Sequence, residues 1–438
     1  MKRISLSFLL ILIDITVLVV LFYLTKYIRA DINDEVFPIF LELQLRDFYF
    51  VIFIASSLMF YEKIYTLRYD FWQETKKVMA SLFYAYLVIM ALLALTKVSQ
   101  DYSRLFITLY FLLAIIILPI IKRFVKSLIY RIPLFIKKVY IVGEKMQVDA
   151  LKKEFKKNWY LGMKYDNKSF DTVVITSKGT DIVSIKKSIE KYLENHTEVY
   201  IVPYVSSINF ANSNIMEYSN IRYNTIQVEN KLLLFYNLLI KNIFEYFLLL
   251  IIFSLFFLVH FVLTTLIRLD SKGGVFFKQH RLGKDNKDFV CYKYRTMHEN
   301  SEKLLEEYLQ EHPEEVAFYE RYHKYKNDPR ITKIGKLLRT TSLDELAQII
   351  NVFKGEMSLV GPRPYMTSES EKLGESQHFI LKVKPGITGL WQVSGRNDLT
   401  FKERNELEVW YIKNWSLWAD FVIIIKTIKV VLSKVGAK

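Results

Sequence analysis

The chain has 438 residues, of which 52% are hydrophobic, and its mean hydropathy is +0.16. This length fits two or three domains, and the hydropathy is high for a soluble protein, so membrane segments are expected. The formal charge of +15 indicates an anionic partner, which could be nucleic acid, anionic lipid headgroups or a nucleotide substrate. Nucleic acid is the weakest of these because no nucleic-acid-binding motif accompanies the charge. The single cysteine, Cys291, excludes an internal disulfide framework and is expected to pack in the interior.

Four apolar runs occupy the first third of the chain. Three approach the length of a membrane-spanning helix, and the second is shorter but contains only the mildly polar Ser56 and Ser57. Asp14 lies inside the first run, where an acid is expected to face other helices or water. The runs predict a four-helix transmembrane bundle over residues 1–130. They cover residues 4–24, 49–60, 78–95 and 105–121.

Basic residues indicate the orientation of this bundle. They gather on the connector between the second and third runs and on the segment after the fourth. The positive-inside rule therefore places both ends of the bundle in the cytoplasm. The first connector, with Asp31, Asp34, Glu35 and Glu42, is predicted to lie outside. The cations are Lys63, Arg68, Lys76, Lys77, Lys122, Arg123, Lys126, Arg131, Lys137 and Lys138.

A different pattern follows over residues 138–225. Short β-rich runs at 139–143, 171–177 and 199–203 alternate with helical stretches, which predicts a small parallel α/β domain. Only Gly143 remains of the G-x-G-x-x-G loop that cradles a dinucleotide, so cofactor binding here is not expected.

A fifth apolar run covers residues 246–267 and lacks Asp, Glu, Lys and Arg, so it could span a bilayer by length. Cations flank it on both sides, and both ends therefore prefer the cytoplasm. A helix that enters and returns on one face satisfies both preferences. No proline occurs between Pro203 and Pro313, so a bend would depend on the internal polar residues. These are Ser254, His260, Thr264 and Thr265.

Two further segments are amphipathic or charged. Residues 299–327 are strongly charged, with Pro313 dividing two helical stretches, which is typical of a solvated face. Residues 417–435 predict an amphipathic helix that lies either in the membrane interface or against the core.

Adjacent carboxylates, Asp344 and Glu345, lie in a segment rich in cations. Ser342 is a good N-cap for a helix whose apolar residues recur at helical spacing, and both acids then fall in its first turn. The positive end of a helix favours anions, so a phosphate could lie beside a carboxylate nucleophile there. On these four residues alone, however, an S-x-x-E capping box is the favoured interpretation. The nearby cations are Arg330, Lys333, Lys336, Arg339 and Arg363.

Four separated motifs resemble the bacterial sugar transferase family, the polyprenyl-phosphate hexose-1-phosphate transferases also called large monotopic phosphoglycosyl transferases. Ordered matches of this kind are far more specific than one short motif. The resemblance covers residues 240–438. The motifs are FFKQHRLGKDNKDFVCYKYRTM at 276–297, DPRITKIGKLLRTTSLDELAQIINVFKGEMSLVGPRP at 328–364, KPGITGLWQVSGRND at 384–398 and YIKNWSLWADF at 411–421.

The resemblance implies that Asp344 is the nucleophile and Glu345 its acidic partner. It implies transfer of a sugar 1-phosphate from a UDP-sugar to polyprenyl (undecaprenyl) phosphate with release of UMP, through an Asp-linked phosphosugar, as the first membrane step of glycan assembly. It also implies a Rossmann-like domain over residues 138–225, here with a degenerate glycine loop. The segment 240–438 is expected to form an α+β catalytic domain on the cytoplasmic surface of the bacterial inner membrane, with a re-entrant helix at 246–267. A homodimer is a further expectation.

Cations within the motifs are candidates for phosphate contacts, because arginine offers a two-pronged donor that matches phosphate oxygens. Asp344 and Glu345 are the candidate ligands of a Mg²⁺ ion that would help to neutralise the diphosphate. The candidate phosphate ligands are Arg281, Lys293, Arg295, Arg330, Arg339, Arg363 and Arg396.

Two other functions compete with this one. A membrane-anchored nucleotide-sugar dehydratase or oxidoreductase would explain the membrane helices and the α/β domain, and Tyr160 and Lys164 supply a Y-x-x-x-K pattern. The missing glycine loop counts against it. A non-catalytic regulator of polysaccharide export would explain charge and hydropathy, but it leaves the arrangement at 328–364 unexplained.

Overall fold

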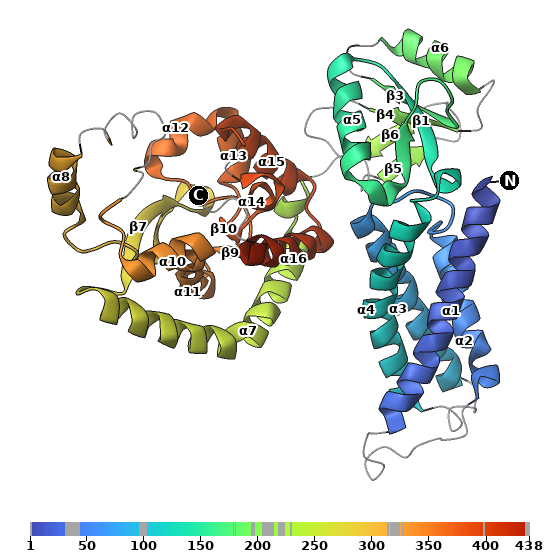
Figure 1. Cartoon of the computed structure of the whole chain (residues 1–438), viewed down its shortest axis with the longest axis horizontal. Helices are drawn as coiled ribbons and strands as arrows, with labels where there is room; N and C mark the ends of the chain where they lie inside the picture. Colours follow the sequence, from blue (N-terminus) through green and yellow to red (C-terminus); the bar gives the residue numbers. More distant parts are fainter. Residues whose placement is uncertain are drawn as a thin grey trace. The chain divides into compact units, whose positions relative to one another are not determined.

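The computed structural model divides the chain into two compact units, Met1–Tyr204 and Val205–Lys438 (Figure 1). The predicted outer connector with Asp31, Asp34, Glu35 and Glu42 and the division at Pro313 lie outside the residues that the structure describes. The described residues are 2–30, 44–95, 103–177, 179, 181–193, 198–203, 214–217, 224–227, 230–312, 315, 325, 328–396 and 399–433.

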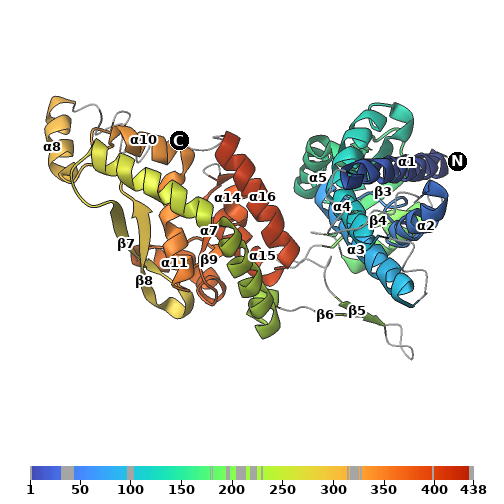
Figure 2. The ribbon, with the colours of Figure 1, turned by 90° about the horizontal axis from the view of Figure 1, so that it is seen from below.

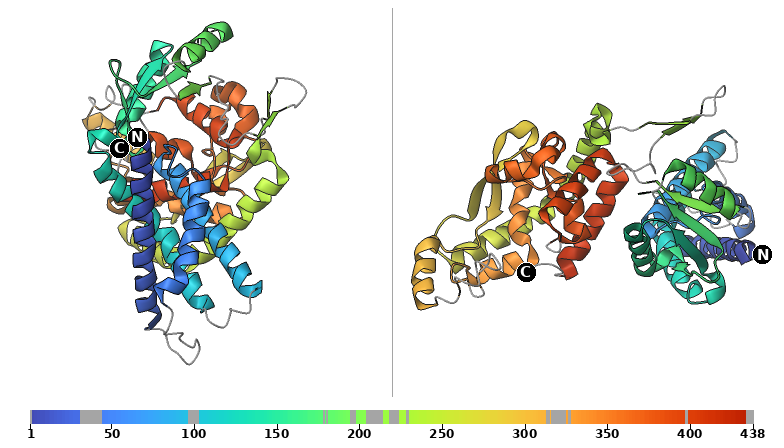
Figure 3. Two further views of the ribbon diagram at one scale, coloured as in Figure 1. Left: turned by 90° about the vertical axis from the view of Figure 1, so that its right-hand side faces the viewer. Right: turned by 90° about the horizontal axis from the view of Figure 1, so that it is seen from above.

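The first unit begins with four helices packed side by side (Figure 3). Phe22, Phe48 and Tyr110 are almost wholly buried where the helices meet, with ring centroids 4.9–5.1 Å apart between neighbours. By length and apolar composition α1, α3 and α4 could cross a membrane, whereas α2 has only 17 residues. The helices are α1 (Lys2–Ala30), α2 (Leu45–Tyr61), α3 (Phe71–Leu95) and α4 (Arg104–Ile129).

Buried charges connect these helices. Lys122 Nζ donates to Asp14 Oδ2 at 2.6 Å, so Asp14 faces other helices as predicted, and Lys126 donates to Glu74. Lys122 and Lys126 were predicted to lie on the basic segment that follows the fourth apolar run. That prediction is wrong for these two residues, because both are on α4 and at most 3% exposed. Their i, i+4 spacing on α4 turns both ammonium groups towards acids on α1 and α3.

A small parallel sheet follows, as the alternating pattern predicted. Its strand order is β2-β1-β3-β4, and Val139, Ile141 and Val174 form its core. Tyr160, of the Y-x-x-x-K pattern, is only 3% exposed, and the Lys126 ammonium lies 4.6 Å from the centre of its ring. The elements are η2 (Pro133–Phe135), β1 (Lys137–Val142), α5 (Lys145–Lys157), η3 (Trp159–Leu161), β2 (Met163–Tyr165), β3 (Thr172–Thr176), α6 (Ile182–Leu193) and β4 (Val199–Val202).

The second unit starts with β5 (Asn214–Glu217), β6 (Asn224–Gln227) and η5 (Lys231–Leu233), followed by the 36-residue helix α7 (Phe235–Asp270). At 1.5 Å per residue α7 is about 54 Å long, well beyond the roughly 30 Å of a hydrocarbon core. Figure 1 shows that α7 changes direction midway, and it contains no proline. Most of its large apolar side chains are exposed.

Both ends of α7 contact the same unit (Figure 2). In the first half, Lys241 donates to Glu245 at 2.8 Å and to Asp420 at 2.7 Å, and all three are at least 95% buried. Glu245 also accepts the Ser358 hydroxyl. At the other end Asp270 accepts the backbone N–H of Ile334 at 2.9 Å. The helix therefore lies along its own unit instead of projecting from it.

A hairpin and surrounding helices complete the unit. The hairpin of β7 and β8 is antiparallel, β9 and β10 pair in parallel, and Cys291 is 1% exposed, as expected of a packing residue. The final helix packs on the core, with Asp420 and Ile423 buried, as the second of the two predicted placements requires. The elements are β7 (Phe276–Leu282), η6 (Lys284–Asn286), β8 (Asp288–Tyr294), α8 (Ser301–Glu311), α10 (Lys333–Thr341), η7 (Leu343–Gln348), α11 (Ile349–Phe353), β9 (Ser358–Val360), η8 (Thr367–Glu369), α12 (Ser370–Leu373), η9 (Gly374–Ser376), α13 (Gln377–Ile380), β10 (Gly386–Thr388), α14 (Leu390–Ser394), α15 (Phe401–Lys413) and α16 (Leu417–Ser433).

Ser342 directly precedes the next helical turn, with both acids in the first turn as predicted, but the predicted capping by its side chain is wrong. Ser342 has φ 57° and ψ 19°, ends α10 in the left-handed region, and its side chain caps no backbone N–H. Its hydroxyl instead accepts from Arg396 at 3.1 Å. The helical turn that follows, η7, is of 3₁₀ type, so the S-x-x-E pattern here marks a sharp corner between two helices and not a capping box.

Candidate active site

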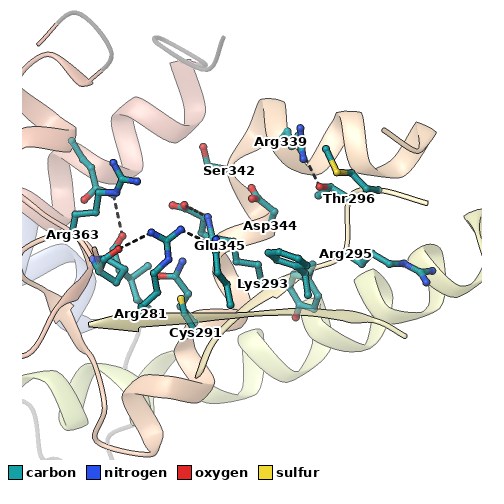
Figure 4. Close-up of a pocket in the computed structure, with 18 of the residues that line it drawn as sticks. Arg281, Cys291, Lys293, Arg295, Thr296, Arg339, Ser342, Asp344, Glu345 and Arg363 are labelled. Atoms are coloured by element: carbon teal, nitrogen blue, oxygen red, sulfur yellow. Dashed lines mark hydrogen bonds and ion pairs between the residues drawn. The ribbon is translucent and has the colours of Figure 1, made fainter. Parts of the chain in front are cut away.

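A cavity of about 510 Å³ lies in the second unit, above the β7–β8 hairpin (Figure 4). Asn351 holds the neighbouring α11 in place, because its side chain donates to Val290 O and accepts from Tyr292 N on β8. The preceding turn, η7, then carries both acids into the cavity. All the predicted site residues except Arg330 line it, namely Arg281, Lys293, Arg295, Arg339, Asp344, Glu345, Arg363 and Arg396.

Asp344 is the unpaired acid of the cavity. Burial, and secondly the negative charge of Glu345, raise its pKa to about 6, against the smaller opposing effects of Lys293 and Arg339. Among the described residues, no other side chain forms an ion pair with it. A carboxylate that is half-buried, without an ion-pair partner and near cations is suited to attack an electrophile or to bind a metal ion.

Glu345, in contrast, is paired. Lys293 on β8 donates to its Oε1 at 2.8 Å, and both side chains remain partly exposed to the cavity. The ion pair fixes Glu345 beside Asp344 and leaves Oε2 open. The two acids thus differ in environment although they are adjacent in sequence.

Two guanidinium groups share one acid on the opposite wall. Arg281 and Arg363 approach Glu369 at 3.7 and 3.5 Å, respectively. Arg281 also donates to Gln279 Oε1 and to Pro364 O. Burial, and secondly the charge of Arg363, lower the pKa of Arg281. One carboxylate between two guanidiniums leaves an excess of positive charge for an anionic ligand.

Glu408 supports this wall from behind and was missed by the sequence analysis. It is 1% exposed, accepts the backbone N–H of Arg363 at 2.7 Å and accepts the hydroxyl of Tyr365. Burial raises its pKa to about 7. In sequence it is one of several glutamates on a charged helix, so no local signal distinguishes it.

The other predicted cations have different partners. Arg339 donates to Thr296 Oγ1 at 2.9 Å at the cavity edge. Arg295 donates to Ser271 and Lys272 just after α7, and Figure 4 shows its guanidinium directed away from Asp344. Arg330 lies outside the cavity lining and forms a two-pronged pair with Asp328. The structure thus gives Arg295 and Arg330 structural hydrogen bonds.

Asp344 and Glu345 could hold a Mg²⁺ ion only together with the phosphate oxygens of a bound substrate. Within the described residues no group of three or more His, Cys, Asp or Glu side chains could hold a metal ion. Mg²⁺ commonly binds through one or two carboxylates plus the phosphates of a substrate, however, and keeps several waters. Asp344 and the open oxygen of Glu345 match that donor set.

The apolar helices indicate a membrane protein, and the cavity places two acids among several cations, an arrangement that suits an anionic ligand. The family profile described as bacterial sugar transferase matches residues 236–434. The chain is 31% identical over 406 residues to the undecaprenyl-phosphate galactose phosphotransferase of Salmonella typhimurium, covering 85% of this chain and 84% of that protein. It is 33% identical over 403 residues to the UDP-galactose-lipid carrier transferase of Erwinia amylovora, with 85% and 84% covered. An uncharacterized sugar transferase of Haemophilus influenzae is 30% identical over 85% of both chains.

The chain therefore belongs to the bacterial sugar transferase family. The similarity extends through the first unit as well as the second, since it covers 85% of the chain.

Proposed function

We propose that the protein transfers a sugar 1-phosphate from a UDP-sugar to undecaprenyl phosphate and releases UMP, as the first membrane step in the assembly of an exopolysaccharide, capsule or O-antigen. The observation that carries the proposal is the half-buried, unpaired Asp344 in a cavity walled by Lys293, Arg339 and the Arg281–Arg363 pair. Two of the relatives, those of Salmonella typhimurium and Erwinia amylovora, are named for an undecaprenyl-phosphate or lipid-carrier acceptor, which supports the same kind of acceptor here.

In this proposal the ionised Asp344 attacks the sugar-linked phosphorus. The bond to the UMP oxygen breaks, and the sugar phosphate becomes linked to Asp344. The lipid phosphate then attacks the same phosphorus, which forms the polyprenyl diphosphate sugar and frees the carboxylate. Arg281 and Arg363 would bind the diphosphate oxygens, and Lys293 would orient Glu345.

A Mg²⁺ ion held by Asp344 and Glu345 would neutralise the negative charge of the diphosphate. Lys293 keeps Glu345 in place for this role, because the pair leaves one carboxylate oxygen open. The phosphate oxygens of the substrate would complete the donor set.

For the membrane arrangement we propose a four-helix transmembrane bundle, a Rossmann-like spacer domain and a re-entrant α7, with the catalytic unit on the cytoplasmic face of the bacterial inner membrane. Support for re-entrancy comes from the two ends of α7, which both contact their own unit while the apolar side chains between them are exposed. A homodimer is part of the same proposal and follows the family resemblance.

The direct test supplies purified protein in membranes with undecaprenyl phosphate and a panel of UDP-galactose, UDP-glucose and their N-acetylated analogues. UMP release and a labelled lipid product are expected with one donor and only when both substrates are present. A tightly bound nicotinamide cofactor, with no UMP from any donor, would support the dehydratase alternative instead.

The rate of the Asp344 step is expected to rise about tenfold per pH unit up to pH ~6 and then to level off. The reason is that the carboxyl, whose pKa is raised to about 6, is protonated and not nucleophilic below that pH. Glu345→Gln removes a charge that raises this pKa, so it should move the acidic limb of the pH–kcat profile to lower pH. The exposed Glu371→Gln serves as control and should leave the limb in place. A limb that stays fixed in Glu345→Gln contradicts this assignment.

A further inference from the structure

A second cavity lies in the first unit, far in sequence from the acids of the candidate active site. It is a groove of about 770 Å³ between the end of α4, helix α5 and strand β2. Four cations line it, and none of its lining residues is acidic. They are Arg131, Lys152, Lys156 and Lys164.

The charge in this groove is largely uncompensated. Arg131, Lys156 and Lys164 are exposed, and among the described residues no acid forms an ion pair with them. Lys152 approaches Asp149 only at 3.6 Å, and its ammonium lies 4.4 Å from the centre of the Tyr165 ring. A concave surface with several cations and no acid attracts an anion.

The groove begins where a membrane helix ends. Ser127, Tyr130 and Arg131 line it directly at the end of α4, which could cross a membrane by length and composition. One to two turns before Tyr130, the ammonium groups of Lys122 and Lys126 instead point into the bundle, where they pair with Asp14 and Glu74. With α4 spanning a bilayer, the groove would open at the depth of the lipid headgroups, next to the hydrocarbon region.

An exposed apolar face of α4 leads into the groove. Ile120 and Phe124 are 61% and 65% exposed, and Leu128 is 45% exposed. Their i, i+4 spacing puts them on one side of the helix, and Leu128 lies one turn from Arg131. Trp159 at the groove is 40% exposed, as is common for aromatic residues at a membrane interface.

We propose that this groove binds the phosphate headgroup of an anionic phospholipid from the leaflet in which α4 ends, with the acyl chains lying on Ile120, Phe124 and Leu128. The cations supply the headgroup contacts, and the absence of acid from the lining favours a net negative lipid over a zwitterionic one. The inference depends on membrane insertion of α4 and not on the chemistry at Asp344.

Native mass spectrometry of the full chain in detergent, titrated with phosphatidylglycerol, tests the proposal. The triple variant Arg131→Gln/Lys156→Gln/Lys164→Gln should bind this lipid at least about tenfold more weakly than the wild type. The matched control Lys153→Gln/Lys157→Gln/Lys187→Gln removes the same charge from exposed positions of the same unit and should stay within about twofold. Phosphatidylcholine should bind both variants alike.

Further arms separate the sources of the phosphate. Equal weakening in both triple variants would mean diffuse surface attraction and would overturn the proposal. Displacement of phosphatidylglycerol by inorganic phosphate would make the groove a site for free anions, and preferential displacement by undecaprenyl phosphate would make it an acceptor site. The variant Phe124→Ser/Leu128→Ser should weaken phosphatidylglycerol binding and leave glycerophosphate binding unchanged. Matching thermal unfolding midpoints establish that the variants are folded.

Discussion

Asp344→Asn is expected to lower UMP release at least about a thousandfold, because the amide cannot displace UMP from phosphorus. Asparagine has nearly the shape of aspartate, and the variant also removes a charge that burial disfavours, so the fold should be retained. The measurement is UMP release from membranes with the preferred UDP-sugar and undecaprenyl phosphate. Activity at the wild-type level would remove Asp344 as the nucleophile.

A single-turnover experiment distinguishes loss of the nucleophile from loss of binding of the UDP-sugar. Without acceptor, the wild type should retain label from a sugar-labelled UDP donor, and Asp344→Asn should retain none. Asp288→Asn is the control, since Asp288 is exposed on β8 and absent from the cavity lining. Retention of covalent label by Asp344→Asn would place the acceptor of the phosphosugar elsewhere.

Lys241→Met is expected to lower the free energy of unfolding of the second unit by about 3–5 kcal/mol, the usual cost of removing one partner from a buried ion pair. Lys241 donates to Glu245, Asp420 and Tyr411, so its loss leaves two buried carboxylates without their cation. Glu245 also accepts the hydroxyl of Ser358 on β9, so this charged cluster attaches the first half of α7 to the sheet. Denaturant titration in detergent, followed by tryptophan fluorescence, measures the change.

Two variants control this experiment. Lys382→Met removes an exposed lysine and should change the unfolding free energy by less than about 0.5 kcal/mol. Lys241→Met/Asp420→Asn should recover part of the loss, because the amide still accepts from Tyr411 and no second unpaired charge remains. A Lys241→Met protein as stable as the Lys382→Met protein would mean that the three charges do not hold α7 in place.

Local sequence patterns predicted the helices and strands well where an apolar run or a β-rich run had clear limits. The apolar runs became helices α1 to α4, and the short β-rich runs became a parallel sheet, since side-chain periodicity reports directly which face is buried. At Ser342 the local pattern misled. A serine three residues before a glutamate is equally compatible with a left-handed corner, and the contact that occupies its hydroxyl comes from Arg396, distant in sequence.

The sequence by itself indicated the family, helices apolar enough to cross a membrane and the adjacent acids Asp344 and Glu345, because these reside in contiguous segments. Only the tertiary structure decided which groups share the cavity. In the structure Arg330 pairs with Asp328 outside the cavity, and Arg295 donates to Ser271 at the end of α7. Glu408 lies behind the cavity wall and accepts the backbone N–H of Arg363. In the structure Lys293 forms its ion pair with Glu345, which leaves Asp344 as the unpaired acid. Burial and ion pairing are properties of residues that meet across the fold, so no local spacing encodes them.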